Sequence, residues 1–168
     1  MNPEISLRPA REEDFPFFFE HQADPVAAGM AVFVSRDREA FNAHWAKWSR
    51  EPTTQLRAVL VRGQVAGSVV SWQADDGRHL LGYWIDRAFW GRGVASAALA
   101  LFLEEVSLRP LSAHVAKTNL ASIRILEKNG FTLTAEARVA LLDGSVREEY
   151  VYTLSAGDTR PSSWRFEL

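Results

Sequence analysis

Hydrophobic and polar positions follow a helical period over two segments near the N-terminus. In residues 11–22 and 36–49, aromatic side chains recur at spacings of three or four positions, which is typical of helices with one buried face. Residues 4–9 alternate as a short strand does, and the segment ends at a proline. We therefore expect a strand followed by two helices, with residues 23–35 forming a loop between the helices.

From residue 55 onward the period changes to two. Residues 55–61 and 65–72 alternate on either side of the turn Arg62-Gly63-Gln64, which predicts a β-hairpin. The turn Asp75-Asp76-Gly77 then leads into a third alternating segment, residues 80–85. The middle of the chain is therefore expected to form an antiparallel meander.

The second half of the chain mixes helical and strand-like segments. It predicts, in order, a helix over 94–107, a strand over 111–116, a helix over 120–129 and a hairpin over 131–142 and 146–154. In the strand, Leu111, Ala113 and Val115 share one face. A strand, a helix and a strand in that order predict a parallel pair joined by a right-handed crossover. The order of elements predicts a mixed α/β (α+β) fold, with residues 1–168 forming a single domain that has its core in 4–154 and a C-terminal tail in 155–168.

The composition excludes several kinds of site. The 168 residues are 47% hydrophobic and 24% charged, which is typical of a globular domain. The chain has no cysteine, which excludes disulfides, thiolate nucleophiles and zinc–thiolate sites, and its four histidines lack the spacing of a metal site. A net charge of −2 gives no basic footprint for nucleic acid, and no apolar run is long enough to cross a bilayer. We expect a cytoplasmic protein that contains no metal and that binds neither nucleic acid nor membranes directly.

A glycine-bearing loop joins the meander to the helix that follows it. Where a strand ends and a helix begins, the first helical N–H groups have no intrahelical partner, and such a terminus binds phosphate. Small residues at Gly91, Gly93, Ala95 and Ser96 would let a pyrophosphate approach this backbone, and Arg92 adds a positive charge. The loop lacks the Gly-Lys-Ser/Thr ending of a Walker A loop and the third glycine or alanine of a dinucleotide fingerprint. Taken alone, it is equally consistent with an ordinary glycine turn.

Two segments carry a family resemblance that extends from residue 5 to residue 154. Residues 82–95 read Gly-Tyr-Trp-Ile-Asp-Arg-Ala-Phe-Trp-Gly-Arg-Gly-Val-Ala, and residues 119–131 contain Asn-x-x-Ser followed by Glu-Lys-Asn-Gly-Phe. In this order, the two segments resemble the fourth strand, pyrophosphate loop and following helices of the GNAT superfamily of acetyl-CoA-dependent N-acetyltransferases. The Tyr-Trp-Ile-Asp strand end and the Trp-Gly-Arg-Gly loop are most similar to the branch of ribosomal-protein alanine and serine N-acetyltransferases.

The resemblance implies both a fold and a reaction. The fold would be GNAT-like, with a mostly antiparallel central sheet, one parallel pair splayed at the acetyl-CoA site, and about four flanking helices. The reaction would transfer an acetyl group from acetyl-CoA to a primary amine, on a protein N-terminus or a small molecule, by direct attack in a ternary complex. A non-catalytic module that binds or senses acyl-CoA on the same fold is the alternative. Dimerisation is common in this branch, so a homodimer is a further expectation.

The resemblance also assigns roles to individual residues. The backbone of Ile85 would pair with the pantetheine arm and polarise the thioester carbonyl, and Asn119 would bond to pantetheine or to a water. Ser122 would protonate the departing thiolate or relay a proton to it. The residues expected to contact acetyl-CoA are Trp84, Ile85, Asp86, Arg87, Gly91, Arg92, Gly93, Val94, Ala95, Ser96, Asn119 and Ser122.

Two positions depart from the family pattern. Leu126 stands where many members have a tyrosine that protonates the thiolate, and Leu141 stands where the ribosomal-protein enzymes have a carboxylate taken as the base. The base is therefore open between a water chain and five titratable candidates, which are Glu20, His21, His79, Glu136 and Glu148. The acceptor site is expected between the first two helices and the final hairpin. Four aromatic residues either line this site or belong to the core: Phe33, Trp45, Trp72 and Trp84.

Overall fold

The computed structural model describes residues 4–32 and 34–156. The elements along the chain are β1 (Ile5–Pro9), the 3-10 helix η1 (Glu12–Asp14), α1 (Phe15–Ala23), α2 (Pro25–Ala31), α3 (Arg38–Arg50), β2 (Gln55–Val61), β3 (Gln64–Gln73), β4 (His79–Ile85), the 3-10 helix η2 (Arg87–Phe89), α4 (Val94–Glu105), β5 (Leu111–Ala116), α5 (Leu120–Lys128), β6 (Thr132–Ala140) and β7 (Val146–Leu154). No helix in these ranges is long and apolar enough to cross a membrane.

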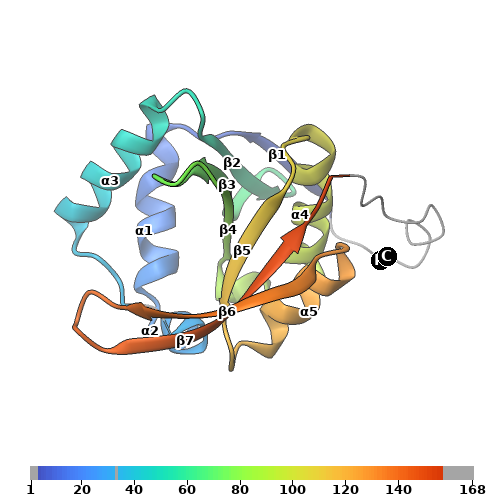
Figure 1. The fold of residues 1–168 in the computed structure, drawn as a ribbon. Helices are drawn as coiled ribbons and strands as arrows, with labels where there is room; N and C mark the ends of the chain where they lie inside the picture. The colour runs from blue at the N-terminus through green and yellow to red at the C-terminus, as the bar shows by residue number, and fades with distance from the viewer. Residues whose placement is uncertain (1–3, 33, 157–168) are drawn as a thin grey trace.

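Seven strands form one sheet in the order β1-β2-β3-β4-β5-β7-β6. β4 and β5 are parallel, and every other neighbouring pair is antiparallel. Figure 1 shows α1 and α3 on one side of the sheet and α4 and α5 on the other. The mixed fold, the mostly antiparallel sheet and the single parallel pair are confirmed.

Two hydrophobic clusters hold these layers together, one on each face of the sheet. The cluster under α4 includes Val59, Val69, Leu81, Leu99, Phe102 and Leu111. The cluster under α1 and α3 includes Phe18, Phe41, Trp45, Ala58 and Val70. Adjacent residues of one strand therefore serve opposite layers, because successive side chains of a strand point to opposite faces. The aromatic stripes of α1 and α3 pack on the sheet as their spacing predicts.

The segment predicted as a loop over residues 23–35 contains a helix, so that prediction was wrong. Pro25–Ala31 forms α2, which brings the α-helices of the described chain to five instead of about four. The Asp24 side chain accepts a hydrogen bond from the Val26 N–H at 3.4 Å, and Pro25 occupies the first helical position, where its missing N–H costs nothing. Val32, in the left-handed region with φ 50°, ends the helix. The turn-forming residues of this stretch concealed a short helix that is capped at both ends.

β3 approaches β4 unusually closely at Gly67. A side chain at Gly67 would collide with the main-chain oxygen of Trp84. The register of β3 against β2 shifts nearby, between Val59 and Leu60, and the Asp86 N–H donates to the Ala66 carbonyl at 2.8 Å. The glycine therefore fixes the end of β4 tightly against β3.

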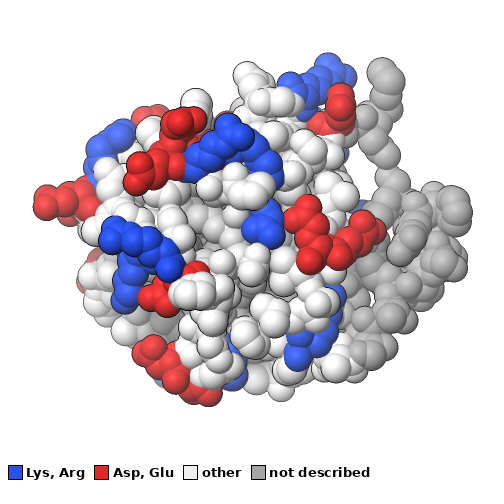
Figure 2. Space-filling view, turned by 90° about the horizontal axis from the view of Figure 1, so that it is seen from above, with Lys and Arg blue, Asp and Glu red and all other residues white. Residues whose placement is uncertain are grey.

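Basic and acidic side chains are interspersed on the face seen in Figure 2 instead of gathering into a patch of one sign. This distribution agrees with the small net charge of −2. Two cavities meet near the end of β4.

Candidate active site

The parallel strands β4 and β5 part after a short stretch of pairing. Their register covers only His79–Leu111, Leu80–Ser112 and Leu81–Ala113. Beyond that point β4 continues along β3 as far as Ile85, while β5 continues along β7 as far as Ala116. A wedge-shaped gap therefore opens at the C-terminal ends of β4 and β5, as the predicted splay requires.

The main-chain groups of Ile85 face this gap. Successive residues of a strand direct their N–H and C=O groups to opposite neighbours. Because the Asp86 N–H bonds to Ala66 of β3, the preceding residue, Ile85, directs its groups away from β3. The Ile85 carbonyl accepts a hydrogen bond from the Trp90 indole N–H at 2.9 Å. The backbone N–H of Ile85 therefore points into the gap.

The N-terminus of α4 opens beside the same gap. Gly91 and Gly93 have φ values of 75° and 72°, which an L side chain rarely adopts, and a Cβ at either position would meet no protein atom within 4 Å. Gly93 caps α4 without a side-chain hydrogen bond. The first N–H groups of this 12-residue helix therefore receive no side-chain cap from Gly93, and such a helix terminus suits an anion.

A cavity of about 550 Å³ joins these features on the α4–α5 side of the sheet. Of the residues predicted to contact acetyl-CoA, the following line it: Trp84, Ile85, Gly91, Gly93, Val94, Ala95, Ser96, Asn119 and Ser122. Two basic residues that sequence reasoning missed, Arg124 and Lys128, line it as well. They lie four positions apart on α5 and so share one side of the helix, a spacing that marked them as a pair. The cavity therefore combines an apolar channel with several groups suited to phosphates.

Ser122 lies where the cavity meets the gap, and its hydroxyl is paired with a phenol. The Ser122 Oγ is 2.6 Å from the Tyr83 Oη, and Tyr83 also donates to the Ser122 carbonyl at 3.2 Å. Burial raises the pKa of the Tyr83 phenol, and the contact with Ser122 opposes that shift only in part. The side chain of Asn119 accepts from the Ser122 N–H at 3.3 Å and caps α5. Asn119 thus fixes the position of Ser122 as well as lining the cavity.

A second cavity, of about 480 Å³, lies on the opposite face of the sheet beneath α1 and α3. Both cavities are lined by Ala31, Tyr83, Trp84, Asn119 and Ser122, so they meet at the gap. Four tryptophans, Trp45, Trp48, Trp72 and Trp84, are among the residues that line the second cavity. Three of the four aromatic residues proposed for an acceptor cleft are therefore present, and the fourth, Phe33, lies outside the described residues.

A buried polar group forms one wall of the second cavity. Glu149, which is fully buried, accepts hydrogen bonds from the Arg147 Nε at 3.1 Å and Nη2 at 2.7 Å. The Nδ1 of His114 lies 2.6 Å from the Glu149 Oε1. His114 is on β5 and Glu149 on the neighbouring strand β7. Sequence reasoning missed both residues, although the alternation that put Leu111, Ala113 and Val115 on one face of β5 placed His114 on the other.

Three residues predicted to contact acetyl-CoA do not line the first cavity: Asp86, Arg87 and Arg92. Asp86 accepts from the Ala88 N–H and lies 3.6 Å from the His21 Nε2, while Arg87 pairs with Asp24 at 3.2 Å. These contacts fasten the end of β4 to α1 and α2. The Arg92 guanidinium lies over the Phe89 ring at 5.8 Å.

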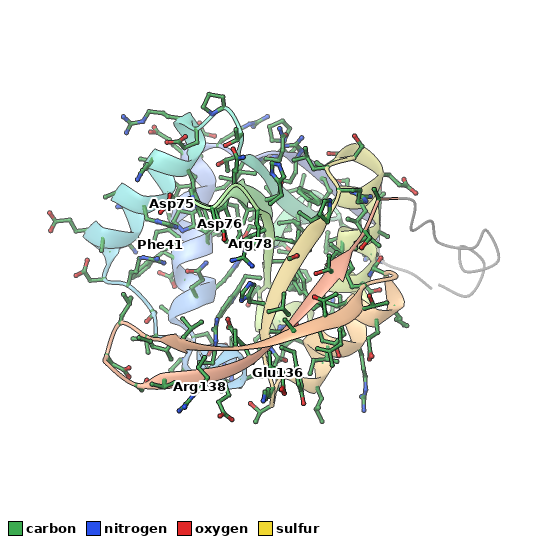
Figure 3. The ribbon with its side chains drawn as sticks, viewed as in Figure 1. Phe41, Asp75, Asp76, Arg78, Glu136 and Arg138 are labelled. Atoms are coloured by element: carbon green, nitrogen blue, oxygen red, sulfur yellow. The ribbon has the colours of Figure 1, made fainter. Side chains whose placement is uncertain are left out.

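The five residues proposed as base candidates line neither cavity. Glu20 pairs with Arg38 at 3.8 Å. Glu136 and Glu148 belong to the β6–β7 hairpin, where Figure 3 labels Glu136 and Arg138, and they pair with Lys117 at 2.8 Å and with Arg138 at 3.9 Å. Burial lowers the pKa of His21, and the Asp86 carboxylate opposes that shift. The fifth, His79, has a buried Nδ1 without a hydrogen-bond partner in the described chain.

Comparison with known proteins agrees with this geometry. Residues 4–132 match the family model described as the acetyltransferase (GNAT) domain. The chain is 34% identical over 74 residues to the probable N-acetyltransferase YjcK of Bacillus subtilis (strain 168), an alignment that spans 42% of this chain and 41% of that protein.

Two solved structures have the same fold. Mycobacterium smegmatis RimJ in complex with CoA-disulfide superposes with a TM-score of 0.77 at 19% identity, covering 96% of this chain and 86% of the other. The ribosomal L7/L12 α-N-protein acetyltransferase RimL in complex with coenzyme A gives a TM-score of 0.75 at 18% identity, covering 92% of this chain and 96% of the other. The match of the family model over most of the chain, together with the parted strands and the helix terminus beside them, shows that this chain belongs to the GNAT acetyltransferase family.

Proposed function

We propose that this protein transfers an acetyl group from acetyl-CoA to a primary amine by direct attack in a ternary complex. The observation that carries the proposal is the gap between β4 and β5, at which cavities from opposite faces of the sheet meet. A donor entering from the α4–α5 side and an acceptor entering from the α1–α3 side would react there without a protein nucleophile. The two substrates need not share an entrance.

The lining of the first cavity supports acetyl-CoA as the donor. Its glycine loop leaves open space in front of the α4 N-terminus, and Arg124 and Lys128 add positive charge on α5. The pyrophosphate would lie on the α4 N–H groups, and the pantetheine arm would run along the end of β4. The RimJ and RimL structures, which hold CoA, support this choice of donor.

The chemistry requires that charge on the thioester oxygen be stabilised as the amine attacks. The Ile85 N–H faces the gap and would donate to this oxygen. A fixed backbone donor of this kind stabilises the transition state more than the ground state, because it is aimed at charge that develops only during the reaction.

The departing thiolate requires a proton or a hydrogen bond. Ser122 lies at the junction of the cavities and would donate to it. An aliphatic hydroxyl is a weak acid, but Tyr83, whose Oη lies 2.6 Å from the Ser122 Oγ, would turn its proton from the Ser122 carbonyl to the Ser122 hydroxyl as the serine donates. The pair therefore supplies the phenol that is lost where Leu126 replaces the tyrosine of other family members.

The acceptor would be a primary amine on a small molecule or a protein N-terminus. The tryptophans that line the second cavity favour an acceptor with an apolar group near its amine. RimL is named for its action on an N-terminal α-amine, which is why protein N-termini are included.

Thiol release tests the proposal. The protein would be mixed with acetyl-CoA and a panel containing phenethylamine, spermidine, free amino acids, and peptides that begin with Ala, Ser or Met. We expect free CoA together with an acetylated amine of matching mass for at least one member. A non-catalytic module that senses acyl-CoA would instead gain thermal stability from acetyl-CoA and release no thiol with any member.

A further inference from the structure

The His114–Glu149 pair has a defined proton arrangement. Burial raises the pKa of Glu149, but the hydrogen bonds from His114 and Arg147 outweigh it and hold this pKa below its usual range. An ionised carboxylate can only accept, so the short 2.6 Å contact requires a proton on the His114 Nδ1. In a neutral ring, the Nε2 of His114 is then the proton-accepting atom.

This Nε2 is buried and has no hydrogen-bond partner in the described part of the chain. Buried polar atoms in folded proteins are nearly always paired, and an unpaired one calls for an explanation such as a role in catalysis. The ring lines the second cavity together with Gly82 and Trp84, which flank the gap. A substrate amine, or a water held by it, would supply the missing partner.

We propose that His114 is the general base of the reaction and that Glu149 is its positioning residue, an assignment that rests on the proposed acetyl transfer. The acceptor ammonium, R–NH₃⁺, would give one proton to the His114 Nε2. The neutral amine would then form the new C–N bond, and the thioester C–S bond would break as CoA leaves with a proton that Tyr83 supplies through Ser122. The second proton, which the amine nitrogen loses as the amide forms, would return through the same hydroxyls to Tyr83. The products are the amide, CoA–SH and one proton, which His114 returns to solvent.

The surrounding charges favour this direction of proton transfer. The charged side chains that line the second cavity with His114 are Glu149 and Arg147 from β7, and Arg78 from the turn before β4. Arg147 holds Glu149 through two hydrogen bonds, and Arg78 pairs with Asp76 at 2.7 Å; Figure 3 labels both members of that second pair. The Glu149 carboxylate is therefore the charge in direct contact with the imidazole, and it would stabilise the imidazolium once the proton arrives.

The test compares His114→Gln, Glu149→Gln and the matched control His79→Gln, which changes a histidine of the neighbouring strand that lines neither cavity. The measurement is kcat/KM against pH, by thiol release with the panel amine that the wild-type protein acetylates fastest. We expect His114→Gln to lower kcat/KM by about 100-fold at pH 7 and to recover as the amine loses its own proton at high pH. Glu149→Gln should lower it less and shift the acidic limb of the profile, while acetyl-CoA binding should stay within twofold of wild type in all three variants.

The outcomes separate the two proposals. A wild-type protein that acetylates no panel member overturns the proposed function. An active wild type with an unchanged pH profile in His114→Gln overturns the role of His114 alone. Nitrogen NMR of the ring gives a second measurement that needs no acceptor: we expect the Nδ1–H tautomer at pH 7.5 in wild type and its loss in Glu149→Gln. A proton on Nε2 of the wild type at that pH would contradict the assignment.

Discussion

The Tyr83 phenol and the Ser122 hydroxyl lie 2.6 Å apart at the point where the two cavities meet. Tyr83 comes from β4 and Ser122 from the first turn of α5, so the contact bridges the splayed strand and the helix that carries the Asn-x-x-Ser motif. The contact therefore joins the two segments from which the family is recognised in the sequence.

Removing either hydroxyl should slow acetyl transfer at saturating acetyl-CoA. We expect Ser122→Ala to lower kcat by about 30-fold and Tyr83→Phe by about 10-fold, because each interrupts proton delivery to the thiolate. The double variant should be little slower than Ser122→Ala, since the two groups act as one relay. Tyr150→Phe is the matched control on β7 and should keep the wild-type kcat. If the two losses in kcat multiplied in the double variant, the hydroxyls would act independently and the relay would be contradicted.

Gly93→Ala should weaken acetyl-CoA binding, whereas the same substitution at a glycine outside the first cavity should not. At Gly93, φ is 72°, and a methyl group would enter the open space proposed for the pyrophosphate. Gly77→Ala is the control, since its φ is 88° but it lies in the β3–β4 turn away from that cavity. Both variants should lose about 1 kcal/mol of stability through backbone strain. Only Gly93→Ala should raise the KM for acetyl-CoA, by about 10-fold or more; an equal rise in both variants would indicate strain alone.

Much of the lining of the first cavity could be predicted from the sequence, because it depends on local backbone. Gly93 and Asn119 act within a few residues of their own position, at a helix terminus and a helix cap, so their roles follow from short motifs. The antiparallel meander of β2, β3 and β4 and the helix α4 follow similarly from hydrophobic period and turn residues. The seven-residue helix α2 could not be predicted in this way, because it is short and lacks a periodic apolar face.

The His114–Glu149 contact beside the second cavity could not be predicted in the same way, because it depends on which strands become neighbours. His114 and Glu149 are 35 positions apart and meet only because β7 pairs with β5 ahead of β6 in the sheet. Nothing local to either residue indicates that contact. The base candidates taken from the sequence were titratable residues near the expected cleft, and most proved to be paired on the surface.

Gly67→Ala should destabilise the protein strongly. The added methyl would collide with the Trp84 carbonyl in the adjacent strand, so β3 and β4 would have to separate. We expect a loss of about 3 kcal/mol in the free energy of unfolding measured in urea, together with weaker acetyl-CoA binding because Ile85 would move. Gly29→Ala in α2 is the control, because a Cβ there meets nothing within 4 Å. It should stabilise by about 0.5–1 kcal/mol; a Gly67→Ala protein as stable as this control would contradict the close approach.

Asp14 should make stability depend on acid pH. Its buried carboxylate accepts from the Arg8 Nη1 at 2.7 Å and Nη2 at 2.8 Å and from the Arg11 N–H at 2.8 Å. Burial raises the pKa of Asp14, but the hydrogen bonds from Arg8 and Arg11 outweigh it and lower the pKa overall. A group whose pKa is lower in the folded state stabilises the protein above its unfolded pKa of about 3.9, and this contribution is lost as the pH falls through the folded value.

Asp14→Asn should therefore cost about 2 kcal/mol of unfolding free energy at pH 7, the size of a buried hydrogen bond to a charged group. The difference from wild type should begin to narrow below about pH 4, where Asp14 of the unfolded wild-type chain takes up a proton, and should close as the pH falls through the lower pKa of folded Asp14. Urea unfolding at several pH values measures this difference, with Glu13→Gln as the control for an exposed neighbour in η1. If the difference in unfolding free energy between Asp14→Asn and wild type stayed constant down to pH 3, the contact with Arg8 would stabilise the protein through its shape and hydrogen bonds. The charge of Asp14 would then contribute nothing.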